Sequence, residues 1–96
     1  MRRSAPKHLS SAVASVIRDL GLGPKIRQFQ AVDLWPAVVG DKIASVAKAE
    51  RIEGGKLIVR VSRSTWRNEL VFLRRELIAR MNKAMHQEII KDIIFR

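Results

Sequence analysis

The sequence predicts a mixed α+β fold in which helices cover one face of a three-stranded sheet. Three observations indicate this fold: two short segments flank the pair Gly54-Gly55, a long amphipathic stretch follows them, and a β-branched run closes the sequence. Two further helical stretches precede the glycine pair. The predicted order is therefore helix, helix, strand, strand, helix, strand.

The composition is that of a basic protein with enough apolar residues to fold. The 96 residues include 19 Lys and Arg against 9 Asp and Glu, which gives a net charge of +10, and 47% of them are hydrophobic. This length has room for one modest core, so we expect a single domain over residues 10–96 after a flexible basic arm over residues 1–9. The positive charge favours a polyanionic partner such as nucleic acid.

The sequence also indicates a compartment. It contains no cysteine, which excludes disulfides and cysteine-based metal sites and fits a reducing compartment. Charged residues interrupt the apolar residues after Met1-Arg2-Arg3, so a signal-peptide core is not predicted there. No uncharged stretch approaches the length of a membrane span. We therefore expect a cytoplasmic protein.

Two helices are predicted before the strands. Ser10 or Ser11 can cap the first helix, and Gly21 provides its natural end. The apolar residues between them recur at helical spacing: Val13, Val16, Ile17 and Leu20. The second helix follows the breaker at residues 21–24, and Pro36 predicts a kink or a break in it because proline removes a backbone donor.

The strands are predicted from alternation around the glycine pair. Residues 45–53 alternate weakly, whereas residues 56–62 alternate clearly. Gly54-Gly55 tolerates positive φ angles, so the two segments should form an antiparallel hairpin. In the second strand, one face carries the predicted core residues Leu57, Val59 and Val61, and the other face carries Ile58, Arg60 and Ser62.

The last two elements are a long helix and a final strand. The helix opens at Ser64 and has a predicted core stripe at spacings of three and four: Trp66, Leu70, Leu73, Leu77, Met81 and Ala84. The strand lies within residues 88–96. The second face of the sheet should stay open, where Ile58, Ile90 and Ile94 would form an apolar patch if the register allows. Such a patch favours a protein contact, and self-association is a second explanation of it.

Basic side chains concentrate where the second strand runs into the long helix. Arg60 on the outward strand face, Arg63 at the junction and Arg67 one turn into the helix can project toward one edge, where the first helical amides add positive charge. The alternative is that these arginines form a solvated face that keeps the protein soluble. The candidate nucleic-acid-binding residues are Lys56, Arg60, Arg63, Arg67, Arg74 and Arg75.

Other kinds of site are weakly supported. Trp66 could stack on an unpaired base, but its position on the apolar stripe favours a place in or beside the core. His8 and His86 are far apart in sequence, and no glycine-rich stretch ends in Gly-Lys-Ser or Gly-Lys-Thr. We therefore expect no enzymatic activity, no metal and no cofactor.

Several motifs occur in an order that is more specific than any one of them. They are Trp35-Pro36-Ala37-Val38-Val39-Gly40, then Gly55-Lys56-Leu57-Ile58-Val59-Arg60-Val61, then Ser64-Thr65-Trp66-Arg67-Asn68-Glu69-Leu70, and a closing Ile-rich strand. In this order they resemble the DciA family of bacterial proteins. The resemblance implies a KH-like fold and a partner that helps load the replicative helicase DnaB onto single-stranded DNA without being an ATPase. By the family pattern, basic residues around Arg63 and Arg67 contribute to DNA contact, while Trp35 and Trp66 are mainly structural.

The leading hypothesis is a non-enzymatic DNA replication accessory protein that binds single-stranded DNA electrostatically and docks on DnaB. The alternative hypothesis, which the same basic face suggests, is a KH-like RNA-binding module that acts on ribosomal or small RNA. A protein that binds anionic lipid at a membrane surface is a third reading, and the commitment of the long helix to core packing disfavours it.

Overall fold

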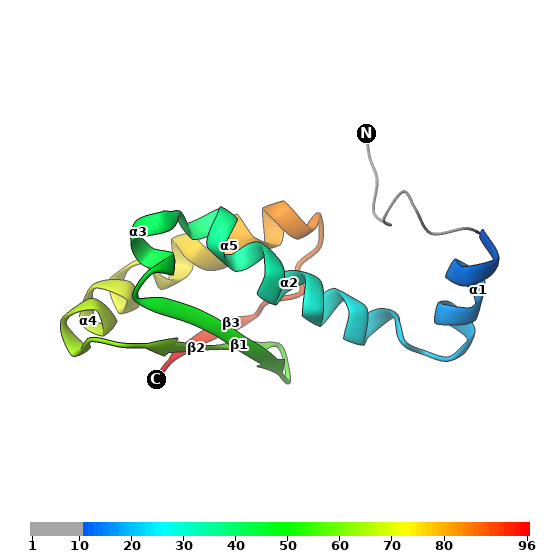
Figure 1. Cartoon of the computed structure of the whole chain (residues 1–96), viewed down its shortest axis with the longest axis horizontal. Helices are drawn as coiled ribbons and strands as arrows, with labels where there is room; N and C mark the ends of the chain where they lie inside the picture. The colour runs from blue at the N-terminus through cyan, green and yellow to red at the C-terminus, as the bar shows by residue number, and fades with distance from the viewer. Residues whose placement is uncertain (1–10) are drawn as a thin grey trace.

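Five helices and a three-stranded sheet make up the part of the chain that the structure, a computed structural model, describes: residues 11–96 (Figure 1). The basic arm expected over residues 1–9 lies outside this part. In chain order the elements are α1 (Ser11–Asp19), α2 (Gly23–Val39), α3 (Asp41–Ala44), β1 (Ala47–Glu53), β2 (Lys56–Val61), α4 (Ser64–Phe72), α5 (Arg74–Met85) and β3 (Asp92–Phe95). The predicted α+β class and the order of the three strands among the helices are confirmed, whereas the short helix α3 is additional and the predicted long helix is divided into α4 and α5.

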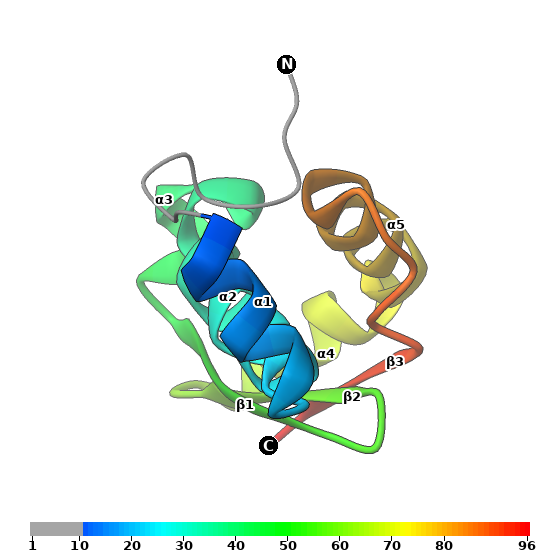
Figure 2. The same ribbon diagram turned by 90° about the vertical axis from the view of Figure 1, so that its right-hand side faces the viewer.

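The sheet has the order β1-β2-β3, with β2 in the centre. β1 pairs with β2 antiparallel, whereas β3 pairs with β2 parallel. A parallel pair needs a crossover connection, and α4 and α5 form it. The helices lie on one side of the sheet, and no described helix covers its second face (Figures 1 and 2).

The hairpin between β1 and β2 forms as the glycine pair predicts. Gly54 and Gly55 have φ angles of 56° and 81°, values at which residues with side chains are strained and glycine is not. The register shifts between Ala49 and Arg51, which marks a β-bulge in β1. Because of the bulge, Ile52 faces the core, where strict alternation from Lys48 would have placed it on the open face.

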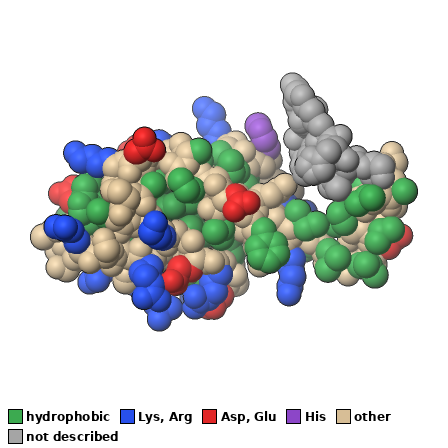
Figure 3. All heavy atoms as spheres, in the orientation of Figure 1, with side chains coloured by type: hydrophobic (Ala, Val, Ile, Leu, Met, Phe, Trp, Pro, Cys, Tyr) green, Lys and Arg blue, Asp and Glu red, His purple; other side chains and the backbone are tan. Residues whose placement is uncertain are grey.

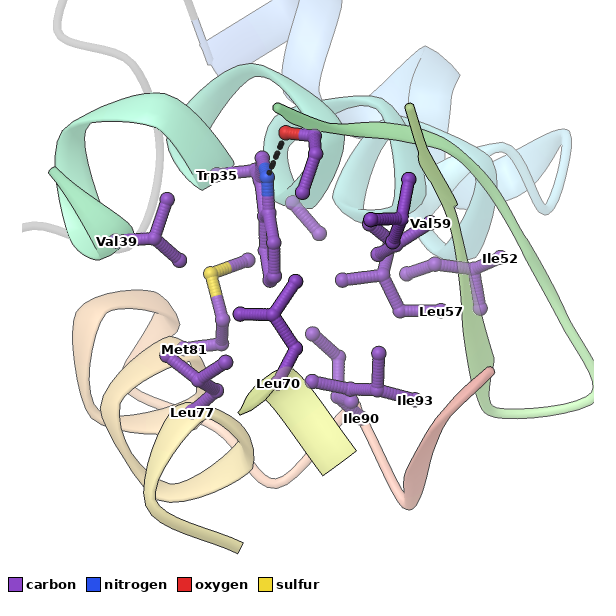
Figure 4. Packing of buried hydrophobic residues seen from close by; sticks show 13 residues of the cluster. Trp35, Val39, Ile52, Leu57, Val59, Leu70, Leu77, Met81, Ile90 and Ile93 are labelled. Atoms are coloured by element: carbon purple, nitrogen blue, oxygen red, sulfur yellow. Dashed lines mark hydrogen bonds between the residues drawn. The ribbon is translucent and has the colours of Figure 1, made fainter. Parts of the chain in front are cut away.

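The core lies between the central strand and the helices (Figure 4). Leu57, Val59 and Val61 face it, as the alternation predicted. Trp35 of α2 is 1% exposed, and its indole N–H donates a hydrogen bond of 2.9 Å to the carbonyl of Ala47 at the start of β1. This bond fixes α2 against the sheet edge, because Trp35 has its apolar ring in the core and its only polar atom satisfied.

A side-chain clamp holds the segment that leads into β3. The side-chain amide of Asn82 donates to the carbonyl of Ile90 at 2.8 Å, and its oxygen accepts from the backbone N–H of Ile90 at 2.9 Å. Ile90 is 1% exposed. The expectation that Ile90 could lie on the open face is therefore wrong, because its backbone is tied to α5 and its side chain is in the core.

The predicted break at Pro36 and the predicted single long helix both need correction. α2 runs through Pro36 without a break, because the buried side chains Trp35 and Val39 on either side of the proline hold this turn against the core. The long helix, in contrast, divides at Leu73, whose φ and ψ are −91° and 1°. The division lets α4 pack on β2 and β3 while α5 packs on α2, and Ala84 is exposed instead of buried.

The first helix forms where it was predicted but adds no buried side chain to the core. Its apolar residues Val13, Val16 and Leu20 are 44%, 54% and 65% exposed. α1 lies beyond the sheet at one end of the molecule (Figure 1), and hydrophobic side chains are visible over it (Figure 3).

Replacing Trp35 with phenylalanine should destabilise the fold. Trp35→Phe leaves the buried carbonyl of Ala47 without its donor and removes part of the buried ring, so we expect the free energy of unfolding to fall by about 2 kcal/mol. Urea unfolding followed by circular dichroism measures the change. Phe29→Ala is the control, because Phe29 is 69% exposed and should change stability by less than about 0.5 kcal/mol. Equal effects would contradict the role of Trp35.

Candidate nucleic-acid interface

The six basic residues singled out in the sequence lie on two parts of the structure. Lys56 and Arg60 are on the open face of the sheet, at positions of β2 that alternate with the core residues. The others belong to the helical crossover: Arg63 immediately before α4, Arg67 in α4, and Arg74 and Arg75 in the first turn of α5.

The four arginines of the helical crossover differ in their exposure and in their contacts. Arg63 and Arg75 are exposed, and within residues 11–96 no carboxylate lies within ion-pair distance of either. Arg67 and Arg74 are half-buried, and their Nε atoms are shielded from solvent without a hydrogen-bond partner. The Nε of Arg74 lies 3.8 Å from Oδ1 of Asp92, too far for a hydrogen bond. Of these four arginines, Arg63 and Arg75 are thus the most available to a ligand.

On the open face, the register aligns three cations in one row across the strands. Lys48 of β1 is directly opposite Arg60 of β2. Arg96, just after β3, donates its N–H to Val59 at 2.8 Å and accepts from the N–H of Val61 at 2.7 Å. These two bonds continue the parallel ladder and place Arg96 beside Arg60. We call Lys48, Arg60 and Arg96 the cation row.

A hollow of about 480 Å³ lies at the cation row, lined by Ser45, Val46, Lys48, Arg60, Val61, Ser62 and Arg96. The two serine hydroxyls in its wall already donate to backbone carbonyls: Ser45 to Lys42 at 2.7 Å and Ser62 to Val46 at 3.3 Å. The charged side chains are therefore the donors that remain for an anion in the hollow.

Glu50 partly neutralises the row. Its Oε2 accepts a hydrogen bond of 2.7 Å from the Nε of Arg60, and its Oε1 lies 3.5 Å from Nη1 of Arg51. The hydrogen bond from Arg60 is the main cause of a lowered pKa for Glu50, and the charges of Arg60, Arg51 and Arg96 lower this pKa further, against a smaller opposing effect of desolvation. Glu50 is thus held as a carboxylate among the cations.

The opposite end of the open face is more balanced in charge. Arg51 forms an ion pair with Glu53, and the hydrogen bond from Arg51 to Glu53 raises the pKa of Arg51. Lys56 lies across from Glu53 on one side and from Asp92 on the other. Figure 3 shows Lys and Arg side chains with acids among them along the sheet side of the molecule.

Between these two ends lie the apolar residues expected on the open face. Ile58 and Ile94 are neighbours in the parallel register, as predicted for this face. Ile58 is only 6% exposed, because it lies between Arg51 and Ile94 in the sheet. The apolar patch is consequently smaller than the sequence suggested.

Lys48 and Arg96 were not among the predicted residues. Lys48 lies in the strand with the weaker alternation, and Arg96 follows the last strand, so neither has a local pattern that marks it. Only the pairing of three distant segments shows that both are beside Arg60. The weak alternation of residues 45–53 assigned Lys48 to one face of its strand. Neither the bulge nor the parallel pairing of β3 could be derived from that assignment.

The described residues contain no feature of a metal centre or a membrane span. Among residues 11–96, no group of three His, Asp or Glu side chains could hold a metal ion. None of the described helices has the length and apolar character needed to cross a membrane.

One family model matches almost the whole chain. The model of the family described as "Dna[CI] antecedent, DciA" covers residues 8–95. The chain belongs to the DciA family. It is 23% identical over 88 residues to UPF0232 proteins of Mycobacterium tuberculosis and Mycobacterium bovis, and 22% identical to one of Rhodococcus jostii. These matches cover 92% of this chain and 47% of each relative, so the chain spans about half the length of these relatives.

The two tryptophans of the DciA motifs occupy structural positions. Trp35 is buried, and Trp66 is half-buried and packs against the core, as its place on the apolar stripe predicted. The likeness to a KH fold stays a prediction. α4 and α5 are joined at Leu73, and no glycine occurs from Ser64 to Met85, so these two helices are not connected by the Gly-x-x-Gly loop that KH domains use to clamp nucleotides.

Removing the Arg60 side-chain charge should raise the pKa of Glu50. In Arg60→Gln the charge-assisted hydrogen bond is lost, so this pKa should move up toward the ordinary value for glutamate, as measured by NMR titration of the Glu50 carboxyl. A depressed pKa in the folded state stabilises the fold above the unfolded pKa, and this contribution is lost as the pH falls through the folded value. Arg51→Gln is the control and should cause a smaller shift. An unchanged pKa in Arg60→Gln would contradict the assignment.

Proposed function

We propose that this protein binds single-stranded DNA electrostatically and acts as a non-enzymatic accessory partner that helps load the replicative helicase DnaB. The observation that carries the proposal is membership of the DciA family over residues 8–95. The helicase role is what that membership suggests for the chain. A place in the cytoplasm, where replication occurs in bacteria, follows from the same proposal.

The distribution of charge supports the DNA-binding part of the proposal. The net charge is +10, and basic side chains on the open face and the helical crossover contribute to it. Contacts with phosphates dominate the affinity of such proteins and make it depend on salt. Few exposed aromatic side chains are available to stack on bases, and the helical crossover lacks a nucleotide clamp, so charge should supply most of the binding energy.

Affinity for single-stranded DNA should fall steeply with salt. If four to six phosphates are neutralised, the slope of log affinity against log salt should be roughly −3 to −4, from about 0.7 per phosphate. The double variant Arg63→Gln/Arg75→Gln removes two exposed cations without acidic partners, so the slope should become shallower by about 1.4. Fluorescence anisotropy of a labelled oligonucleotide over a salt series measures both slopes.

The matched control for this experiment is Arg51→Gln/Arg80→Gln. It removes the same charge from two arginines that form ion pairs, with Glu53 and Glu76 respectively, so it should change the slope less. A flat salt response of the unaltered protein would contradict electrostatic binding of DNA. Competition with RNA of the same sequence tests the alternative that the chain is an RNA-binding module, which tighter binding of RNA would favour.

Association with the helicase is tested separately. Purified DnaB should retain the protein in a pull-down, and addition of the protein should increase the amount of DnaB bound to single-stranded DNA at a fixed DnaB concentration. The protein alone should hydrolyse no ATP in the same buffer. A protein that binds DNA but neither associates with DnaB nor increases its loading would contradict the replication role while leaving the DNA-binding part intact.

A further inference from the structure

We infer that the hollow at the cation row is a phosphate-binding site, which takes one phosphodiester group of a single strand in exchange for the carboxylate of Glu50. This inference rests on the proposed binding of single-stranded DNA and assigns it a location. The site is built from Lys48, Arg60 and Arg96, of which the sequence singled out only Arg60.

The first support is that the cation row carries more positive charge than Glu50 neutralises. Lys48 and Arg60 are directly opposite in the antiparallel pair, and like charges at such positions repel each other. Arg96 adds a third positive charge on the other side of Arg60. The fold would lose nothing by carrying a neutral residue at Lys48, since this side chain is exposed. An anion bound between these side chains relieves the repulsion.

The second support is that the three cations surround a concave space. The hollow of about 480 Å³ lies within the rough range of 300 to 1,000 Å³ that ligand pockets occupy. Among the residues that line it, the backbone N–H of Ser62 already donates to the carbonyl of Val46 at 2.9 Å and that of Val61 to the carbonyl of Arg96 at 2.7 Å. The space therefore suits a ligand that needs charged donors rather than backbone contacts.

The third support is that one cation of the row, Arg60, already binds a carboxylate, that of Glu50. Glu50 is 2.7 Å from the Nε of Arg60, the geometry of a charge-assisted hydrogen bond. A phosphate oxygen can replace the carboxylate oxygen in this bond without loss of geometry. Glu50 lies on the bulged segment of β1 and stays within reach of Arg51 at 3.5 Å, so it keeps a cationic partner when it leaves Arg60.

The inference predicts that neutralising Glu50 and neutralising a cation of the row have opposite effects on the affinity for single-stranded DNA. Glu50→Gln removes the competing carboxylate and should bind single-stranded DNA about threefold more tightly than Glu53→Gln, which makes the same charge change at the balanced end of the face. Lys48→Gln and Arg96→Gln should each bind about threefold to tenfold more weakly than the unaltered protein, and should reduce the salt slope by about 0.7. Arg80→Gln removes the same charge from an arginine of α5 that pairs with Glu76; it is the matched control for both cations and should weaken binding less.

Two further measurements separate a binding role from a structural one. The unfolding midpoint of Lys48→Gln should not decrease, because the substitution removes a like-charge pair, so weaker DNA binding cannot come from a weaker fold. The Nε–Hε NMR signals of Arg60 and Arg96 should shift when the unaltered protein is titrated with single-stranded DNA, and the signal of Arg80, which pairs with Glu76 on α5, should shift less.

The outcomes distinguish the site from the proposed function. If the protein binds DNA with the expected salt dependence but Lys48→Gln and Arg96→Gln match Arg80→Gln, the phosphate site is wrong and the proposed function stands. If Glu50→Gln binds no more tightly than Glu53→Gln, the exchange of Glu50 is wrong. If the unaltered protein binds no single-stranded DNA, the proposed function is wrong, and the proposed phosphate site is wrong as well.

Discussion

The parallel pairing of β3 with β2 is the constraint on which the rest of the structure depends. It joins residues more than thirty positions apart in the sequence, such as Leu57 and Ile93, and it requires α4 and α5 to cross over one face of the sheet. It also fixes which side of each strand faces the helices. One register therefore determines both the core residues and the row of cations on the open face.

The break between α4 and α5 follows from the same constraint. α4 contacts β2 and β3, whereas α5 contacts α2 and β3. The turn at Leu73 allows Leu70 to be buried near the strands and Leu77 and Met81 to be buried near α2. The clamp from Asn82 to Ile90 then returns the chain to the sheet in the correct position for β3.

The open face combines charges in a way that packing does not require. Its hairpin end alternates cations with acids, whereas its other end aligns Lys48, Arg60 and Arg96 with Glu50 as the carboxylate that contacts Arg60. Exposed ion pairs contribute little to stability, and opposed like charges reduce it. The fold therefore gains little stability from these charges, and the proposed binding of a phosphate group would give them a role.

The sequence by itself determined the elements that depend on local patterns: the glycine hairpin, the apolar face of β2, the class of the fold, and the family motifs. It also identified Arg60 and the helical arginines, because their positions follow from the alternation of one strand and the start of one helix. Only the tertiary structure decided the continuity of α2 through Pro36, the break at Leu73, the bulge in β1, and the burial of Ile90. It alone placed Lys48 and Arg96 beside Arg60. The reason is physical: these features depend on contacts between segments distant in sequence, whose packing and register outweigh local propensity.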